Sequence, residues 1–424
     1  MHPFHPLPDW IALEHSVAEI LTTQELHGWY FDESSSRELE QSLRRELEDL
    51  TCLLRDRHPF VAGTVFNPKR DNRTKGYVAG FEFIRLKELN PTSRDHISWI
   101  LQTHYGWTPK LISSKNKKPV IDEIILKDIG TDIALRFLRC LELKKALGMI
   151  SEGVNAWLKL CTTSSRIHHH CSVATNTFRC AHRKPNLAQT PAGEEFRKLF
   201  KASPGMKMVG ADLSGIELRM LAHYLARYDG GRYADILLNG DIHQVNADKI
   251  GISRRAVKTV TYAFLYGASA TRIGTSYDKQ LSPAKAAAKG KEIRDAFIKA
   301  IPGLSELLSA VKRRSTSGAI LAIDGRRILV DSQHKSLNYL LQCSAGVIAK
   351  RWLLIADETI KEAGLRAHQL AFIHDELQYE CDPKHIDDVK FTLENSAVRA
   401  GEYYNLRVPI EAEAKSGRDW SEVH

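Results

Sequence analysis

Leucines recur at every third or fourth position between Leu39 and Leu54, and charged residues lie between them. This spacing puts the leucines on one face of a helix, so the pattern predicts helices through the first 60 residues, with the serines at 34–36 as N-caps. Residues 57–80 break the period with prolines, glycines and a cluster of cations. We therefore expect an exposed loop in that stretch.

Helix-like and strand-like patterns alternate further along the chain. The predicted helices lie at residues 94–107, after a turn and cap signal at 90–93, at 134–150, over most of 240–315 and at 337–364. Short strands and turns are predicted from about residue 160, a strand and then a helix within 206–228, a hairpin turning at Asp324-Gly325, and a strand pair centred on His374-Asp375. Strands and helices are thus mixed in the second half of the chain.

Composition narrows the class of protein. The chain has 424 residues, of which 43% are hydrophobic and 26% charged, a globular composition that excludes disordered and fibrous proteins. No apolar run reaches the length of about 18 residues that a membrane span needs, and the first residues lack the layout of a signal peptide. The seven scattered cysteines are typical of reduced thiols, so we expect a cytoplasmic protein without a membrane partner. The net charge of +9 favours a polyanionic partner.

Two turns carry carboxylates. A strand-like run ends at Asp212 before an amphipathic helix, and the last predicted strand pair turns at His374, Asp375 and Glu376. A carboxylate at a strand end is held rigidly, as a metal ligand must be, and two such turns could converge on a pair of Mg²⁺ ions bound with substrate phosphates. Two alternatives stay open: Asp212 caps the following helix, and the second turn is simply solvated.

A third segment contains cations and aromatics at helical spacing. Arg254, Lys258, Tyr262 and Tyr266 are each four residues apart, so on a helix they form one stripe about 18 Å long. Two cations suit phosphates, and two rings suit a sugar and a base. His243 is a further candidate donor to a phosphate. The alternative is a surface helix whose cations are solvated and whose tyrosines pack inward.

Residues 168–182 hold four histidines and two cysteines, which raises the question of a zinc site. Zinc sites favour short, regular ligand pairs, and neither half of this segment supplies one. Adjacent side chains of a strand also point to opposite faces, so the histidine triplet cannot converge on one ion. The segment therefore does not predict zinc.

Together these segments resemble the family A DNA polymerases, and most closely the replicative polymerases of short-tailed bacteriophages. "DLSGIELRMLAHYLARYDGGRYADILLNGDIH" is similar to the first palm motif and its continuation, "RRAVKTVTYAFLYGAS" to the fingers helix, and "FIHDELQYE" to the last palm motif. Further similar segments are "PNLAQTP", "DGRR…LNYLLQCSAG", "NPTSRDHI" and the closing "GRDW…H". The resemblance runs from about Asp9 to His424.

The resemblance implies an α+β right-hand fold with an antiparallel-sheet palm, helical fingers and a helical thumb. The thumb, with a short N-terminal lead-in, would cover residues 1–158, the first part of the palm 159–224, the fingers 225–325 and the second part of the palm 326–424. It also implies a nucleotidyltransferase that adds deoxynucleoside triphosphates to a primer on a DNA template, in phage replication.

The family's site residues carry over by position. Asp212 and Asp375, with the backbone carbonyl of Leu213, would hold two Mg²⁺ ions. Arg254, Lys258 and His243 would bind the triphosphate, and Lys258 would also give a proton to the leaving pyrophosphate. Tyr262 would stack on the incoming sugar, Tyr266 would lie near the templating base, and Glu217 would exclude a ribose 2′-hydroxyl. The residues implied at the primer and template are Arg179, Gln189, Asn338, Gln342, His374 and Glu376.

Four features of the sequence bear on these expectations. The family's Thr-Gly-Arg turn is Thr177-Phe178-Arg179 here, and we expect phenylalanine to exclude a positive φ at that point. No acidic exonuclease motif precedes the thumb, so we expect no proofreading in this chain and leave room for a separate exonuclease partner. The segment at about residues 58–89 is much shorter than the phage insertion that docks thioredoxin, which argues against dependence on thioredoxin. The basic surplus would hold duplex DNA by its phosphates, with an affinity that falls steeply as salt rises.

Three rival functions remain to be weighed. A single-subunit RNA polymerase conflicts with Glu217 as a gate against the 2′-hydroxyl. A catalytically inactive DNA-binding processivity subunit would be expected to lose a metal carboxylate, yet Asp212 and Asp375 are both present. A metal nuclease would need clustered acidic residues beyond the two turns. Incorporation of ribonucleotides or deoxyribonucleotides separates the first rival from the main expectation.

Overall fold

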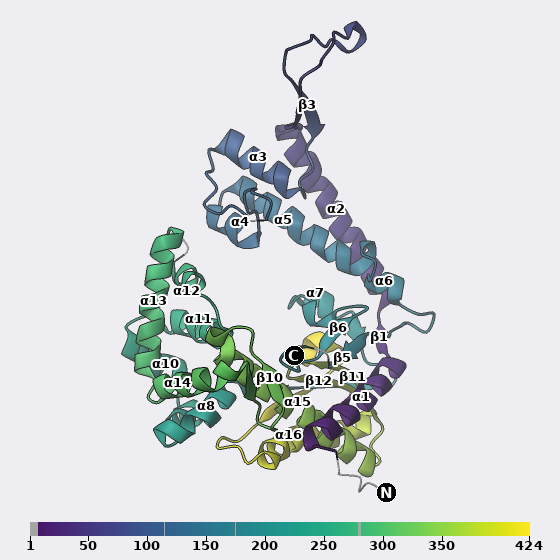
Figure 1. The fold of residues 1–424 in the computed structure, drawn as a ribbon. Coiled ribbons are helices and arrows are strands. Elements are labelled where there is room, and N and C mark those ends of the chain that lie inside the picture. The colour runs from purple at the N-terminus through teal and green to yellow at the C-terminus, as the bar shows by residue number, and fades with distance from the viewer. Residues whose placement is uncertain (1–6, 114, 174, 279–280) are drawn as a thin grey trace, which may run out of the picture. The chain divides into compact units, whose positions relative to one another are not determined.

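The structure is a computed structural model that describes residues 7–113, 115–173, 175–278 and 281–424. The chain forms two compact units (Figure 1). One consists of Met1–Glu33 and Leu160–His424, and the other of Ser34–Lys159. The segment up to Glu33 therefore packs with the second half of the chain.

The unit formed by Ser34–Lys159 is mainly helical. Its elements are α2 (Glu33–Arg57), β2 (Phe60–Phe66), β3 (Phe83–Glu88), α3 (Arg94–Tyr105), α4 (Glu123–Ile129) and α5 (Asp132–Leu147), which continues into a π-helical turn at Gly148–Glu152. Ser93 caps α3 by accepting a bond from the backbone N–H of His96. The predictions of a cap at this point and of the two helices that follow are confirmed.

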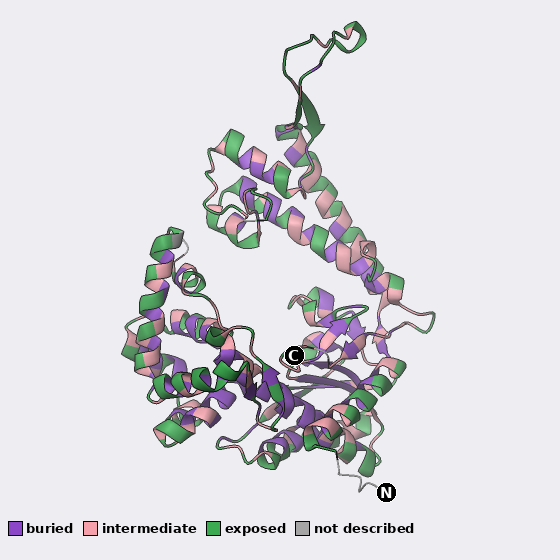
Figure 2. Cartoon of the chain, in the orientation of Figure 1, coloured by how far each residue is buried: buried purple, intermediate pink, exposed green. Residues whose placement is uncertain are grey.

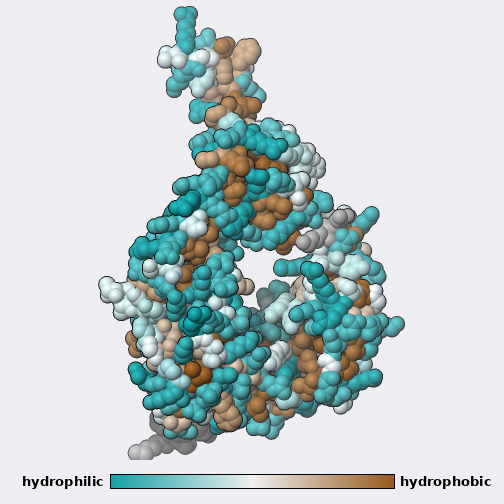
Figure 3. All heavy atoms as spheres, turned by 180° about the vertical axis from the view of Figure 1, so that it is seen from behind, coloured by the Kyte–Doolittle hydropathy of each residue, from teal (hydrophilic) through white to brown (hydrophobic). Residues whose placement is uncertain are grey.

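Two predictions in the first 90 residues are wrong. Residues 57–80 are not a plain loop, because β2 pairs with β3 as an antiparallel hairpin. The hairpin lacks an alternating pattern since most of its side chains are exposed, including Phe60 and Leu86, and Figure 3 shows apolar residues on its surface. Serines 34–36 lie inside α2, which begins at Glu33, so they do not cap it.

The other unit combines several small sheets with many helices. Its strands are β1 (Trp29–Phe31), β4 (Arg166–Ile167), β5 (His170–Ser172), β6 (Ala181–Arg183), β7 (Phe200–Lys201), β8 (Lys207–Leu213), β9 (Ala319–Leu321), β10 (Arg327–Leu329), β11 (Ala367–Ile373), β12 (Glu376–Cys381) and β13 (Ala412–Gly417). Its helices are α1 (Asp9–His27), α7 (Glu194–Arg197), α8 (Ile216–Asp229), α9 (Arg232–Asn239), α10 (Ile242–Ile250), α11 (Arg254–Leu265), α12 (Ala270–Tyr277), α13 (Pro283–Ala300), α14 (Leu304–Arg314), α15 (Ser336–Glu362) and α16 (Ile386–Tyr403). The short helix α6 (Trp157–Leu160) lies at the boundary of the units.

The largest sheet is antiparallel, with the strand order β11-β12-β8-β13. Helices α15 and α16 pack against each other, and α16 also contacts β8 and β13. The side chains of β12 are buried on both faces (Figure 2). The predicted strand pair is confirmed as β11 and β12. The alternation of buried and exposed side chains that the sequence suggested for these strands is wrong. An antiparallel sheet covered in this way gives the two acidic turns a rigid support.

The short strand β1 was not predicted within the first 60 residues. It follows α1 directly, and its Trp29 and Phe31 are fully buried. Strand β1 pairs with β4 and β7. Three residues are too few to show a period, so the sequence pattern could not separate this strand from the helices on either side.

No helix in the described ranges is both long enough and apolar enough to cross a membrane.

Candidate active site

The two acidic turns meet because β8 and β12 are neighbouring strands. Asp212 lies opposite Glu376 in the register of this pair. The backbone N–H of Leu213 donates to the carbonyl of Asp375 at 3.0 Å. Asp212 does not cap α8, because Gly215 occupies the N-cap position and the helix makes no side-chain cap bond. The capping interpretation is therefore wrong, and the structure brings Asp212 and Asp375 together.

Both aspartates have a raised pKa, because they are buried close to other carboxylates. Burial, together with the charges of Asp212 and Glu217, raises the pKa of Asp375 to about 7. Burial and the charge of Glu376 raise the pKa of Asp212 to about 6. Divalent cations such as Mg²⁺ prefer carboxylate oxygens and would remove this repulsion, so the donor set fits the metal that the sequence predicts.

The carboxylate of Glu376 is bonded to other side chains of the protein. Its carboxylate accepts bonds from Trp420 Nε1 at 2.6 Å and Gln378 Nε2 at 2.6 Å, and it pairs with His424 Nδ1 at 3.1 Å. Burial would raise the pKa of Glu376, but the bonds and charge of these partners, His424 foremost, lower it. Trp420 and His424 received no role from the sequence, although the closing "GRDW…H" segment could have drawn attention to them.

A second cluster joins the turn of Arg179 to the predicted fingers helix. The guanidinium of Arg179 donates to Glu217 Oε1 at 2.8 Å, and the hydroxyl of Tyr266 donates to the same oxygen at 2.8 Å. Glu217 is buried. The pKa of Tyr262 is raised by burial and then by the charges of Glu217 and Asp375. The aromatic end of α11 therefore faces the carboxylates.

The expectation that Phe178 excludes a positive φ is wrong. Phe178 has a φ of 56°, and its N–H closes a turn onto the carbonyl of Thr175. A left-handed conformation costs a non-glycine residue roughly 1–2 kcal/mol. The guanidinium of Arg326 lies 4.8 Å from the centre of the Phe178 ring, and a desolvated cation–π contact contributes about 2 kcal/mol. Packing thus offsets the strain.

The cationic end of α11 is open to solvent. Arg254 and Lys258 are exposed, and Arg254 Nε donates to Asp241 at 2.6 Å. His243 on α10 is buried, and its ring lies 6.2 Å from that of Tyr262. The exposure of the two cations therefore fits the alternative of a surface helix with solvated cations. Both tyrosines, in contrast, lie beside carboxylates.

The remaining predicted residues are more widely spread. Asn338 on α15 is buried and donates its side-chain N–H to the carbonyl of Leu265 at the end of α11. Gln342 lies one turn further along α15 and is half-buried, whereas Gln189 is exposed in a short 3-10 turn. His374 has a φ of 61° and its ring lies 6.0 Å from that of His182. The structure brings Asn338 to α11 and His374 to the carboxylates.

The three consecutive histidines at residues 168–170 bind different partners. His168 pairs with the carbonyl of Glu25, His169 with the side chain of Gln24, and His170 with the carboxylate of Glu25. In the described part of the chain, no group of three or more His, Cys, Asp or Glu side chains is arranged to hold a metal ion.

Two buried histidines of residues 168–182 are expected to lose their contribution to stability as the pH falls from 7.5 to 5.5. Burial lowers the pKa of His169 to about 3 and that of His182 to about 4. Because an unfolded histidine titrates near 6.5, the unfolded state takes up protons first, and the stability present above pH 6.5 is lost as the pH falls toward 4. At pH 5.5 each histidine accounts for a loss of about 1 kcal/mol in the free energy of unfolding. Urea unfolding of the wild type and of a His182→Phe variant at the two pH values isolates this contribution, because the raised pKa values of Asp212 and Asp375 act in the opposite direction. An equal change in midpoint for the two proteins would contradict the prediction.

Comparison with known proteins gives matches over most of the chain. Residues 72–422 match the family model "DNA polymerase family A". The chain is 32% identical to the DNA-directed DNA polymerase of Enterobacteria phage T3 and 30% identical to that of Escherichia phage T7, in each case over 98% of this chain and 70% of the relative. The polymerase domain of Pol1 from M. smegmatis, solved with DNA primer-template and dNTP, has a similar fold, with a TM-score of 0.78 and 20% identity over 97% of this chain and 70% of that one.

The chain therefore belongs to DNA polymerase family A. Its enzyme class, DNA-directed DNA polymerase, is confirmed with the family. The fold with mixed helices and antiparallel sheets is confirmed as that of a polymerase domain.

Proposed function

We propose that this chain catalyses template-directed DNA synthesis in phage replication, with two Mg²⁺ ions held by Asp212, Asp375 and the carbonyl of Leu213. The observation that carries the proposal is the bond from Tyr266 to Glu217, since it joins the end of the cationic helix α11 to the start of α8, shortly after the turn of Asp212. A triphosphate would then have cations on one side and metal-binding carboxylates on the other. The phage relatives named above support replication as the process.

In the proposed reaction the primer 3′-oxygen attacks the α-phosphorus of the incoming nucleotide and the bond to the β-phosphate breaks. When held by Asp212, Asp375 and the carbonyl of Leu213, two Mg²⁺ ions would lower the pKa of the primer hydroxyl and neutralise phosphate charge. Arg254, Lys258 and His243 bind the triphosphate. Lys258 gives its proton to the departing pyrophosphate, which balances the proton that the primer hydroxyl loses.

Selection of the nucleotide is assigned to the cluster around Glu217. The buried carboxylate, fixed by Arg179 and Tyr266, leaves no room for a 2′-hydroxyl. Tyr262 stacks on the sugar and Tyr266 lies near the templating base. The residues proposed to contact the primer and template are Arg179, Gln189, Asn338, Gln342 and His374. Glu376, whose carboxylate is bonded to protein donors, is proposed to help place the primer end.

The domain assignment is part of the proposal. We assign residues 1–158 to the thumb with its lead-in, 159–224 and 326–424 to the palm, and 225–325 to the fingers. The sheet β11-β12-β8-β13, which carries both aspartates, is then the palm sheet. Synthesis is proposed to take place in the cytoplasm of the bacterial host.

Proofreading is proposed to be absent from these 424 residues and, if needed, supplied by a separate exonuclease subunit, without dependence on thioredoxin. The purified chain is expected to release no mononucleotides from a mismatched single-stranded end when no nucleotide is present. Release of mononucleotides would overturn this part of the proposal, and a change in processivity on adding thioredoxin would overturn the part on thioredoxin.

Primer extension by the purified chain tests the function. With Mg²⁺ and a primed DNA template, deoxynucleotides should be added and ribonucleotides rejected, and a chelator should stop the reaction. Extension with ribonucleotides alone would favour an RNA polymerase. Cleavage of the template without extension would favour a nuclease, and binding without either reaction would favour an inactive DNA-binding subunit.

Replacing Tyr262 with phenylalanine is expected to increase discrimination against dideoxynucleotides by about 10- to 100-fold. The hydroxyl of Tyr262 lies near the charges of Glu217 and Asp375, and a hydrogen bond to a charged group contributes about 1.5–3 kcal/mol. We expect this hydroxyl to take over the role of the missing 3′-hydroxyl. The measurement is the ratio of kcat/KM for a dideoxynucleotide and its deoxynucleotide. Equal ratios for variant and wild type would refute the assignment.

A further inference from the structure

The turn that carries Arg179 rests on a buried arginine from a distant part of the chain. The side chain of Arg326 is fully buried, and its guanidinium lies 4.8 Å from the centre of the Phe178 ring. The ring of Trp10 lies near the same guanidinium, at 5.8 Å. Phe178 immediately precedes Arg179, so a contact to its ring acts on the backbone that carries Arg179.

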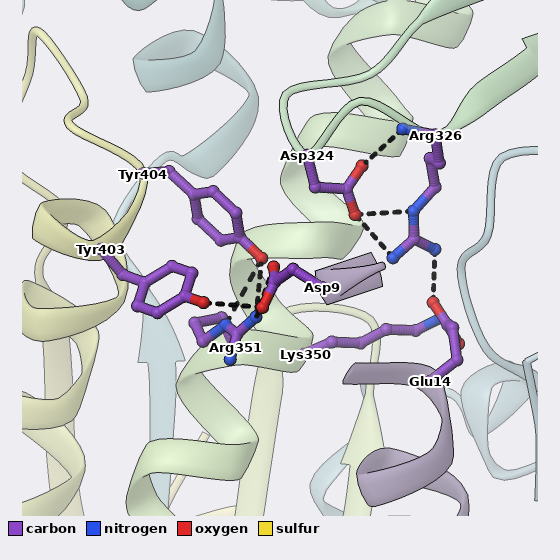
Figure 4. A network of polar contacts seen from close by, with 8 residues as sticks. All are labelled: Asp9, Glu14, Asp324, Arg326, Lys350, Arg351, Tyr403 and Tyr404. Atoms are coloured by element: carbon purple, nitrogen blue, oxygen red, sulfur yellow. Dashed lines mark hydrogen bonds and ion pairs between the residues drawn. The ribbon is translucent and has the colours of Figure 1, made fainter. Parts of the chain in front are cut away.

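Arg326 is itself held firmly by acidic partners (Figure 4). Its Nε donates to Asp324 at 2.7 Å, and Nη1 donates to Glu14 on α1. Glu14 also accepts two bonds of 2.7 Å from Lys350, which is buried on α15. Two carboxylates and two cations are thus paired inside the protein, and breaking any of these pairs would leave an uncompensated buried charge. Arg326 therefore gives Phe178 a fixed support.

The other side of the turn lies against α15. A Cβ atom added to Gly346 would approach the carbonyl oxygen of Phe178 at 3.7 Å and Cγ of Arg179 at 3.5 Å. Thr175 Oγ1 also donates to the carbonyl of Arg179 at 2.6 Å. The ring of Phe178 and its backbone are thus held from different directions, and the side chain of Arg179 extends from this support to Glu217.

We propose that Phe178, stacked on Arg326, is a positioning residue that holds Arg179 on Glu217. The inference rests on the proposed function, in which Arg179 contacts the end of the primer. The alternative is that Phe178 covers Arg326 and contributes only to the stability of the fold. The two differ in one respect: a positioning residue has no effect on catalysis once Arg179 is removed.

A double-mutant cycle tests this difference. Phe178→Gly removes the ring but suits the positive φ, so it relieves backbone strain. We expect it to lower kcat/KM for extension of a matched primer about 10-fold in the wild-type background and less than twofold in an Arg179→Ala background. Phe178→Tyr keeps an aromatic ring and is expected to stay within twofold of wild type. Trp10→Leu removes the more distant ring from Arg326 and serves as the control, also within twofold.

Each outcome decides the question. Equal losses for Phe178→Gly in the two backgrounds, no loss in either, or a loss on Phe178→Tyr equal to that of Phe178→Gly would overturn the inference. If Arg179→Ala extends primers as well as wild type, Phe178 cannot act through it, and the inference fails while the proposed function stands. If wild type itself extends no primer, both fail. Thermal melting of each variant shows whether a loss follows from unfolding, and a loss explained wholly by unfolding counts against positioning.

Discussion

Replacing Asp375 with asparagine is expected to lower kcat for primer extension by about 10³-fold or more. Asparagine keeps the size of the side chain but loses the charge, so it cannot hold a divalent cation as the carboxylate does. Stabilisation of phosphoryl charge by a bound metal contributes several kcal/mol, which corresponds to this loss of rate. The variant should fold normally, because Asp375 meets β8 through its backbone carbonyl.

Single-turnover extension with saturating nucleotide measures the loss, and fluorescence anisotropy with labelled primer-template measures binding. Binding should change little, because the duplex is held by many cations. Asp357→Asn is the matched control: this aspartate lies on α15 and pairs with Lys361, so activity should stay within twofold. Extension by Asp375→Asn within tenfold of wild type would remove Asp375 from the metal site.

Replacing Lys258 with alanine is expected to lower kcat by about 10²- to 10³-fold, since a positioned general acid contributes a factor of about 10²–10⁴. Lys258 lies on the exposed face of α11, four residues before Tyr262. The reverse reaction of primer with pyrophosphate should slow by the same factor, because the residue that gives a proton in one direction removes it in the other.

Rapid-quench assays in both directions provide the measurement. Arg255→Ala is the control, since Arg255 is also an exposed cation on α11 but lies outside the four-residue spacing that joins Arg254, Lys258 and Tyr262. Its activity should stay within twofold of wild type. A rise in KM with an unchanged kcat for Lys258→Ala would leave Lys258 as a ligand for phosphate and not as a proton donor.

Sequence patterns predicted the elements that carry the proposed site residues because those elements are locally determined. The spacing from Arg254 to Tyr262 is a property of one helix, and α11 forms over that stretch. The apolar run before Asp212 and the residues around Asp375 likewise become β8, β11 and β12. Only the family resemblance implied that these strands are neighbours, because no local sequence pattern indicates it.

The features that the sequence did not predict depend on distant residues. Phe178 adopts its left-handed conformation against Arg326, which lies almost 150 residues away in the printed sequence. Glu376 owes its environment to Trp420 and His424, and no local pattern announces either contact. The β2–β3 hairpin was missed for the opposite reason, since its largely exposed side chains leave no hydrophobic period.

The partners of Glu376 have a practical consequence for shortened versions of the gene product. A stop codon just before Trp420 would leave every proposed triphosphate and metal ligand in place. It would also remove two of the three donors to a buried carboxylate, which would then carry an uncompensated charge beside Asp212 and Asp375. Such a shortened chain would still contain all three polymerase motifs, but we expect it to have no activity in a primer-extension assay.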